Sequence, residues 1–256
     1  YKDRKLDLSA LFMGIAIATK FYPGVILFGI TLVFWKQREI ISLVRYLAVT
    51  IVTWSVINLP IAMNNFDGWW RFFKLNIERD SDLGSIWYAA ALLDLPQGNT
   101  NNLTIIAFLL ALGAIGVFYF AVAQSRDDFA NLMTIAFLTV AAFVTISKVY
   151  SPQYILWLTP LAILAMTKKE ERNAFWIWQG AELIYHVAIW QHLATVTGAT
   201  FGLPLYGYAL ITLLRIAATI YLIAIFVRRG LAGGTQGPAA HRSLREFLFE
   251  SGNAYP

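Results

Sequence analysis

The segment Ala18-Thr19-Lys20-Phe21-Tyr22-Pro23-Gly24 interrupts an apolar run that covers residues 8–35. A lysine at membrane depth costs about 3 kcal/mol on insertion scales, so it is usually kept where it meets an anion or water. Pro23 removes a backbone donor and Gly24 tolerates unusual backbone angles, so we expect the helix to break here. The alternative is a proline-kinked span whose lysine reaches the membrane interface.

The charges on both sides of this run favour a break over a kink. Lysine and arginine precede the run at positions 2, 4 and 5 and follow it at positions 36, 38 and 45. Under the positive-inside rule both flanks face the cytoplasm, which a single crossing does not allow. We therefore predict two half-helices, 8–19 and 23–35, that form a re-entrant hairpin with Lys20 at its tip. Irregular backbone at that depth lines a wet cavity or is buried in protein.

The composition is that of an all-α integral membrane protein with several spans. Of the 256 residues, 58% are hydrophobic and 14% are charged, against about 25% charged in soluble domains. The net charge of +5 comes mostly from short connections and chain ends, where it orients the spans, so no nucleic-acid partner is needed to explain it. The chain has no cysteine, which excludes disulfides, thiol nucleophiles and cysteine metal sites. Nothing in the sequence calls for a cofactor.

Apolar runs after the hairpin predict further spans at 43–63, 103–124, 129–147, 152–166, 174–193 and 203–227. With this count Arg38, Lys169 and Arg229 lie in the cytoplasm, whereas Asn99 and Ser151 lie outside. We expect one transmembrane domain at 1–229, the carboxy-terminal part of a longer bundle, followed by a mostly disordered cytoplasmic tail at 230–256. The expected location is the plasma membrane, with the active side outward.

The stretch 66–77 differs from the spans because aromatic and charged residues alternate in it. Its large apolar side chains recur at helical spacing: Phe66, Trp69, Trp70, Phe73 and Ile77. This pattern is typical of an amphipathic helix that lies flat in a membrane interface. We predict such a helix on the outer side.

Two outward loops carry most of the remaining polar groups. The first contains Arg71, Arg79, Asp80 and Asp82, and the second runs from Lys148 to Tyr154. Lysine is a compact point charge for phosphate, so Lys148 and Lys20 indicate a phosphate site; the plainer interpretation is that Lys148 only reaches the interface. The Asp80-Ser81-Asp82 triplet is a weak candidate for a divalent metal, since such triplets are common in solvated loops.

A histidine and a glutamate share one predicted span. Glu182 and His186 stand four residues apart, which puts them on one helix face. They predict either a buried, mutually hydrogen-bonded pair or a proton-handling role, and His186 joins the candidate binding residues. His192, near the outer end of the same span, is expected to be solvated and idle.

Three motifs together resemble one known family. Residues 14–23 fit G-x-x-x-A-x-K-x-Y-P, residues 76–88 are similar to an aromatic outer loop, and residues 148–157 fit K-x-x-S-P-Q-Y-x-x-W. All three resemble the polyprenol-phosphate-sugar-dependent glycosyltransferases of family 87, over about residues 8–166. The resemblance implies the type C glycosyltransferase fold and transfer of a sugar, often mannose, from a lipid phosphate on the outer side. It also implies an acidic catalytic base in a first outer loop, which we expect either in a segment before Tyr1 or supplied in a different way.

The resemblance also implies roles for the candidate residues. Lys20 and Lys148 would approach one outward cavity and bind the phosphate, with Arg71 or Arg79 as helpers. Sugar or phosphate oxygens would be positioned by Tyr22, Tyr150, Gln153 and Tyr154. The expected partners are a polyprenyl-phosphate-sugar donor and a lipid or glycan acceptor. Two alternatives stay open: a transporter or flippase of a lipid-linked or anionic substrate, and a non-catalytic subunit of a glycosyltransferase complex.

Overall fold

The computed structural model describes residues 2–122 and 128–231, and every regular element in these ranges is helical. The predicted tail at 230–256 lies almost wholly outside the described residues. The helices are α1 Lys2–Thr19, α2 Pro23–Lys36, α3 Ile40–Asn64, α4 Phe66–Glu78, α5 Ile86–Leu92, α6 Thr100–Val122, α7 Asp128–Ile146, the 3₁₀ turn η1 Pro152–Tyr154, α8 Ile155–Ala165, α9 Lys169–Val196 and α10 Leu205–Leu231.

Four of the described helices, α3, α6, α7 and α10, are long and apolar enough to cross a membrane. The helical membrane protein expected from composition is therefore supported by length and hydropathy. α2 and the segment Pro152–Ala165 are apolar but shorter. α9 has 28 residues, but its polar and charged side chains lower its mean hydropathy, and it is not among these four helices.

The contacts divide the chain into two compact units. The first comprises the described residues up to Arg79 and residues 128–136, and the second comprises residues 80–122 and 137–231. Each unit is described by itself below.

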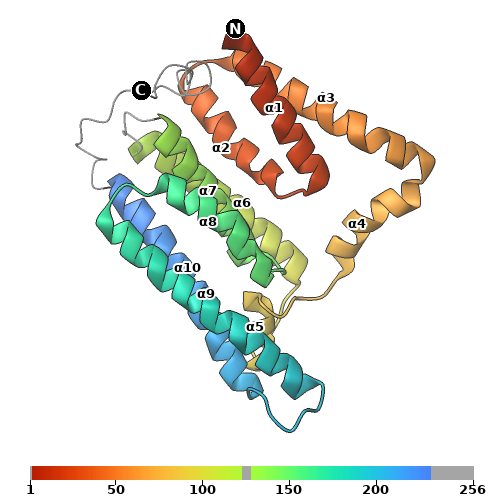
Figure 1. Ribbon diagram of the computed structural model, residues 1–256, viewed down its shortest axis with the longest axis vertical. Coiled ribbons are helices and arrows are strands. Elements are labelled where there is room, and N and C mark those ends of the chain that lie inside the picture. Colours follow the sequence, from red (N-terminus) through yellow and green to blue (C-terminus); the bar gives the residue numbers. More distant parts are fainter. Residues whose placement is uncertain (1, 123–127, 232–256) are drawn as a thin grey trace, which may run out of the picture. The chain divides into compact units, whose positions relative to one another are not determined.

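The break predicted at Lys20 is confirmed. α1 ends at Thr19 and α2 begins at Pro23, the first helical position, where the missing N–H of proline costs nothing. The turn between them is closed by the Gly24 amide, which donates to the Phe21 carbonyl at 3.0 Å. α1 begins at Lys2 rather than at residue 8, so it is longer than the predicted half-helix. In Figure 1 α1 and α2 run side by side in opposite directions.

α3 packs against this hairpin within the first unit (Figure 1). At Gly14 a Cβ atom would lie 2.7 Å from the Thr50 carbonyl oxygen, so α1 and α3 approach closely only because Gly14 has no side chain. The Thr50 hydroxyl donates to the Ala10 carbonyl at 3.2 Å, and Arg45 forms an ion pair with Asp7 at 2.6 Å. Hydrogen bonds and close contact, rather than charge alone, hold these helices together.

The helix predicted at 66–77 is present as α4. Asn65 caps it, since its side-chain oxygen accepts from the Gly68 amide at 2.9 Å. Trp69 donates from its indole nitrogen to the Asn58 side chain at 3.0 Å, and its ring lies 6.4 Å from that of Trp54. The Phe73 ring stands edge-on to that of Phe21 at the hairpin tip, 6.3 Å away. These rings attach α4 to α3 and to the tip, while its place at a membrane interface stays a prediction.

In the second unit α9 and α10 form an antiparallel pair (Figure 1), and α5 packs on α10. At one end of this pair Arg229 meets Glu171 at 3.0 Å and donates to the Ala165 carbonyl at 2.7 Å. Glu171 also accepts from the Thr167 and Lys168 amides. The ends of α8, α9 and α10 that are predicted to be cytoplasmic are thus joined by one ion pair.

Candidate functional site

A buried ion pair lies between α9 and α10 in the second unit. The Arg215 Nε donates to both carboxylate oxygens of Glu182 at 2.9 Å, and neither side chain is exposed at all. The Tyr150 hydroxyl donates to the same carboxylate at 3.0 Å. Burying two charges is costly unless each finds a close partner and further hydrogen bonds. This pair meets both conditions.

The other side of the Arg215 guanidinium faces backbone rather than side chains. Nη1 donates to the Tyr150 carbonyl at 2.7 Å, and Nη2 donates to the Ser151 carbonyl at 3.3 Å. The guanidinium carbon also lies 3.6 Å from the centre of the Tyr150 ring and 4.1 Å from that of Tyr185, in cation–π contact. Arg215 therefore uses its planar fork of donors to connect Glu182 with the loop at residues 147–151.

A second loop, residues 80–85, is bonded to the first. The Asp82 amide donates to the Lys148 carbonyl at 2.8 Å, and the Tyr208 hydroxyl donates to the Leu83 carbonyl at 3.1 Å. Gly84 is buried, and a Cβ there would lie 2.2 Å from the Tyr150 carbonyl oxygen. We call residues 80–85 and 147–151 the loop pair. The backbone hydrogen bond from Asp82 to Lys148 joins its two loops, and Arg215 of the ion pair bonds the second of them.

Tyr150 is part of this support and is not a surface ligand. Its side chain has no exposed area, so the prediction that it contacts a sugar or phosphate is wrong. Burial, together with the Glu182 carboxylate, raises the pKa of the Tyr150 phenol far above its ordinary value. The phenol therefore stays protonated and donates to Glu182.

The predicted pair of Glu182 with His186 is also wrong. Glu182 faces the interior, where Tyr150 and Arg215 bond it, whereas His186 is exposed on another side of α9. His192, expected to be solvated, is buried: its ring stacks on Tyr208 with centroids 3.9 Å apart, and its Nε2 lies 2.8 Å from the Tyr88 hydroxyl. Contacts between helices, rather than spacing along one helix, select the partners.

Several predicted binding residues do lie together in or next to the loop pair. Lys148 is only 8% exposed, Gln153 is exposed, and the Tyr154 ring stacks on Trp157 at 3.7 Å. Asp80 is exposed and Asp82 half-buried in the partner loop. In the part of the chain that the structure describes, no three His, Asp or Glu residues gather as a metal site.

The other predicted residues belong to the first unit. Lys20 and Arg71 are exposed, and Tyr22 and Arg79 are half-buried. The convergence of Lys20 with Lys148 on one phosphate therefore stays a prediction.

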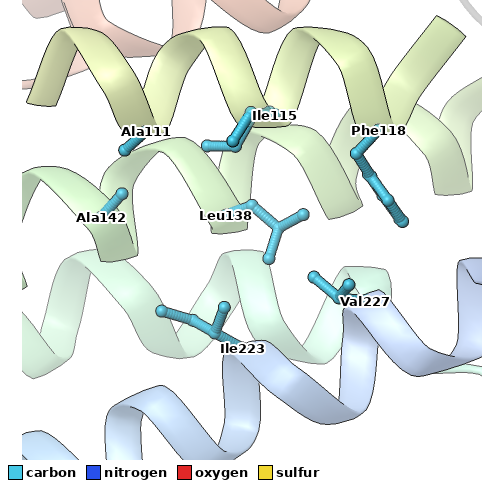
Figure 2. Close-up of a pocket in the computed structure, with 8 residues that line it drawn as sticks. Ala111, Ile115, Phe118, Leu138, Ala142, Ile223 and Val227 are labelled. Atoms are coloured by element: carbon cyan, nitrogen blue, oxygen red, sulfur yellow. The ribbon is translucent and has the colours of Figure 1, made fainter.

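An apolar cavity of about 260 Å³ lies between α6, α7 and α10. Figure 2 shows side chains from all three helices around it. Its lining contains only apolar residues: Ala111, Ala114, Ile115, Phe118, Leu138, Ala142, Ile223 and Val227. Its volume leaves room for part of a hydrocarbon chain.

Comparison with known proteins identifies no relative: no family model, no curated protein and no solved structure matches the chain.

Sequence reasoning missed Arg215, although its signal was of the same kind as that of Lys20. Arg215 stands alone among apolar residues in the middle of a predicted span, where an ionisable side chain is costly and usually functional.

Proposed function

We propose that this chain is a membrane glycosyltransferase that moves a sugar, with mannose favoured, from a polyprenyl-phosphate donor to an acceptor hydroxyl on the outer side of the membrane. One observation carries the proposal. Lys148 sits in a loop whose Tyr150 carbonyl accepts a hydrogen bond from Arg215, the buried partner of Glu182, and the exposed Gln153 follows in the same connection.

The depth of this loop supports a lipid-phosphate site. η1 and α8 together rise about 22 Å, which is less than the roughly 30 Å of a hydrocarbon core. Arg229 anchors the far end of α8, and that end is cytoplasmic under the positive-inside pattern. The loop pair then lies below the outer surface, where an ionisable side chain such as Lys148 is costly and usually functional.

The chemistry of the transfer matches these groups. In an inverting transfer a carboxylate deprotonates the acceptor hydroxyl, and cations stabilise the negative charge that develops on the departing phosphate. Lys148 and Lys20 would supply the cations. The apolar cavity of the second unit would accommodate part of the prenyl chain.

Lys148→Met tests the proposal in purified protein reconstituted with a polyprenyl-phosphate mannose donor. We expect kcat/KM to fall at least about 100-fold, as on removal of one electrostatic stabiliser, with little change in melting temperature. Lys169→Met is the matched control, since Lys169 is exposed at the other end of the second unit. Near-normal turnover for Lys148→Met would mean that the lysine extends to the membrane interface without binding the donor phosphate.

The break between α1 and α2, with Lys20 in it, is also a feature of transporters. Wild-type protein reconstituted into liposomes with the same donor distinguishes a glycosyltransferase from a transporter. Donor that crosses the bilayer without sugar transfer would favour a flippase, and donor that binds without either process would favour a non-catalytic subunit.

A further inference from the structure

Arg215 joins three parts of the second unit that are distant in sequence. Its Nε bonds Glu182 on α9, and its Nη atoms bond two successive carbonyls, those of Tyr150 and Ser151. An ion pair that served only to join α9 to α10 would need no backbone acceptors. Here the two carbonyls belong to residues 150 and 151, in the same loop as Lys148.

The neighbouring contacts all act on the same loop pair. The Tyr150 hydroxyl is held by both Glu182 and the Thr219 hydroxyl, at 3.0 Å and 3.2 Å. The Asp82 amide donates to the Lys148 carbonyl, so a shift of the 147–151 loop would also move the 80–85 loop. The backbone around Lys148 is thus held on both sides.

We infer that Arg215 and Glu182 are positioning residues: the guanidinium, oriented by the carboxylate, sets the backbone of residues 150–151 and thereby places Lys148 against an anionic group of the substrate. The inference rests on the proposed function for the identity of that substrate. Neither residue touches the reacting atoms. A lysine cannot replace Arg215 in this role, because one ammonium lacks the planar fork that reaches a carboxylate and two carbonyls together.

The decisive variant replaces both members of the pair, Arg215→Met with Glu182→Met. Apolar residues of similar volume often replace a buried ion pair without loss of stability. A purely structural role therefore predicts normal activity in a stable double variant. A positioning role predicts a stable protein with a displaced loop, in which kcat falls at least tenfold while KM for the donor changes less.

Loop position is measured without reference to activity. The chain has no cysteine, so Ser151→Cys introduces a single thiol at a half-buried position whose carbonyl, not its side chain, bonds Arg215. We expect a water-soluble maleimide to react at least fivefold faster with this thiol in the double-methionine background. Ala141→Cys, fully buried in α7, reports general loosening and should stay slow. Arg229→Met, at the other end of α10, should leave labelling at residue 151 unchanged.

Unchanged labelling at residue 151 in the folded double variant would overturn the inference. Arg215→Lys is the second variant: it keeps a cation for Glu182, and we expect it to fold, to label faster at residue 151 and to lose activity. If neither variant folded, the pair would be needed for the fold itself, which also contradicts a positioning role. Wild-type protein that transferred no sugar would refute the proposed function alone, since labelling still decides the role of Arg215.

Discussion

Gly84→Ala tests the close contact on which the loop pair depends. The added Cβ would lie 2.2 Å from the Tyr150 carbonyl oxygen, 2.5 Å from the Tyr185 hydroxyl and 2.8 Å from the Arg215 Nη1. Carbon and carbonyl oxygen in contact are normally about 3.3–3.6 Å apart. The Tyr150 backbone must therefore move by roughly 1 Å, although Arg215 already holds it.

The cost has two parts. Overpacking a filled interior costs about 1–3 kcal/mol, and the shift weakens a hydrogen bond to a charged group, which contributes about 1.5–3 kcal/mol. We expect Gly84→Ala to lower the free energy of unfolding by about 3 kcal/mol. Unfolding of the purified protein in mixed detergent micelles measures it.

The matched control is Gly180→Ala on α9. A Cβ at Gly180 meets no described atom within 4 Å, so the change should stabilise the helix by about 0.5–1 kcal/mol. Equal unfolding free energies for the two alanine variants would refute the packing argument at Gly84.

Three further predictions concern other parts of the chain. Single cysteines at Asn99 and Lys169 should differ in labelling from outside intact cells, with Asn99 reactive and Lys169 protected; the reverse result would contradict the predicted topology. Glu171→Ala should lower the free energy of unfolding by about 1–3 kcal/mol, because the half-buried Arg229 then loses this carboxylate and keeps the Ala165 carbonyl and the Thr167 hydroxyl as partners; a loss below about 0.5 kcal/mol in a micelle unfolding experiment would show the pair to be unimportant. Asn65→Ala should destabilise α4 by about 1 kcal/mol, seen as faster amide hydrogen exchange in its first turn only.

Local features of the sequence were enough to predict several elements. The break after Thr19 follows from Pro23 together with Gly24 and the mid-membrane Lys20, since a proline removes one helix hydrogen bond and kinks or breaks the helix. α4 follows from the periodicity of its aromatic residues, and the four apolar helices follow from hydropathy. α1 extends beyond the predicted half-helix because the charged residues before Leu8 are helical rather than a separate flank.

The partners inside the bundle depended on tertiary structure. The spacing predicts that Glu182 bonds His186, one helical turn away. Its partners in the structure are Tyr150 and Arg215, which are 32 and 33 residues distant in the sequence. Periodicity shows which residues share a face of a helix, whereas the direction of that face depends on the neighbouring helices. The sequence by itself therefore determined an all-helical chain with apolar spans and a break at Lys20. Only the packing of α9 against α10 decided that Arg215 bonds the loop next to Lys148, because a buried charge is stable only where other elements supply its hydrogen-bond partners.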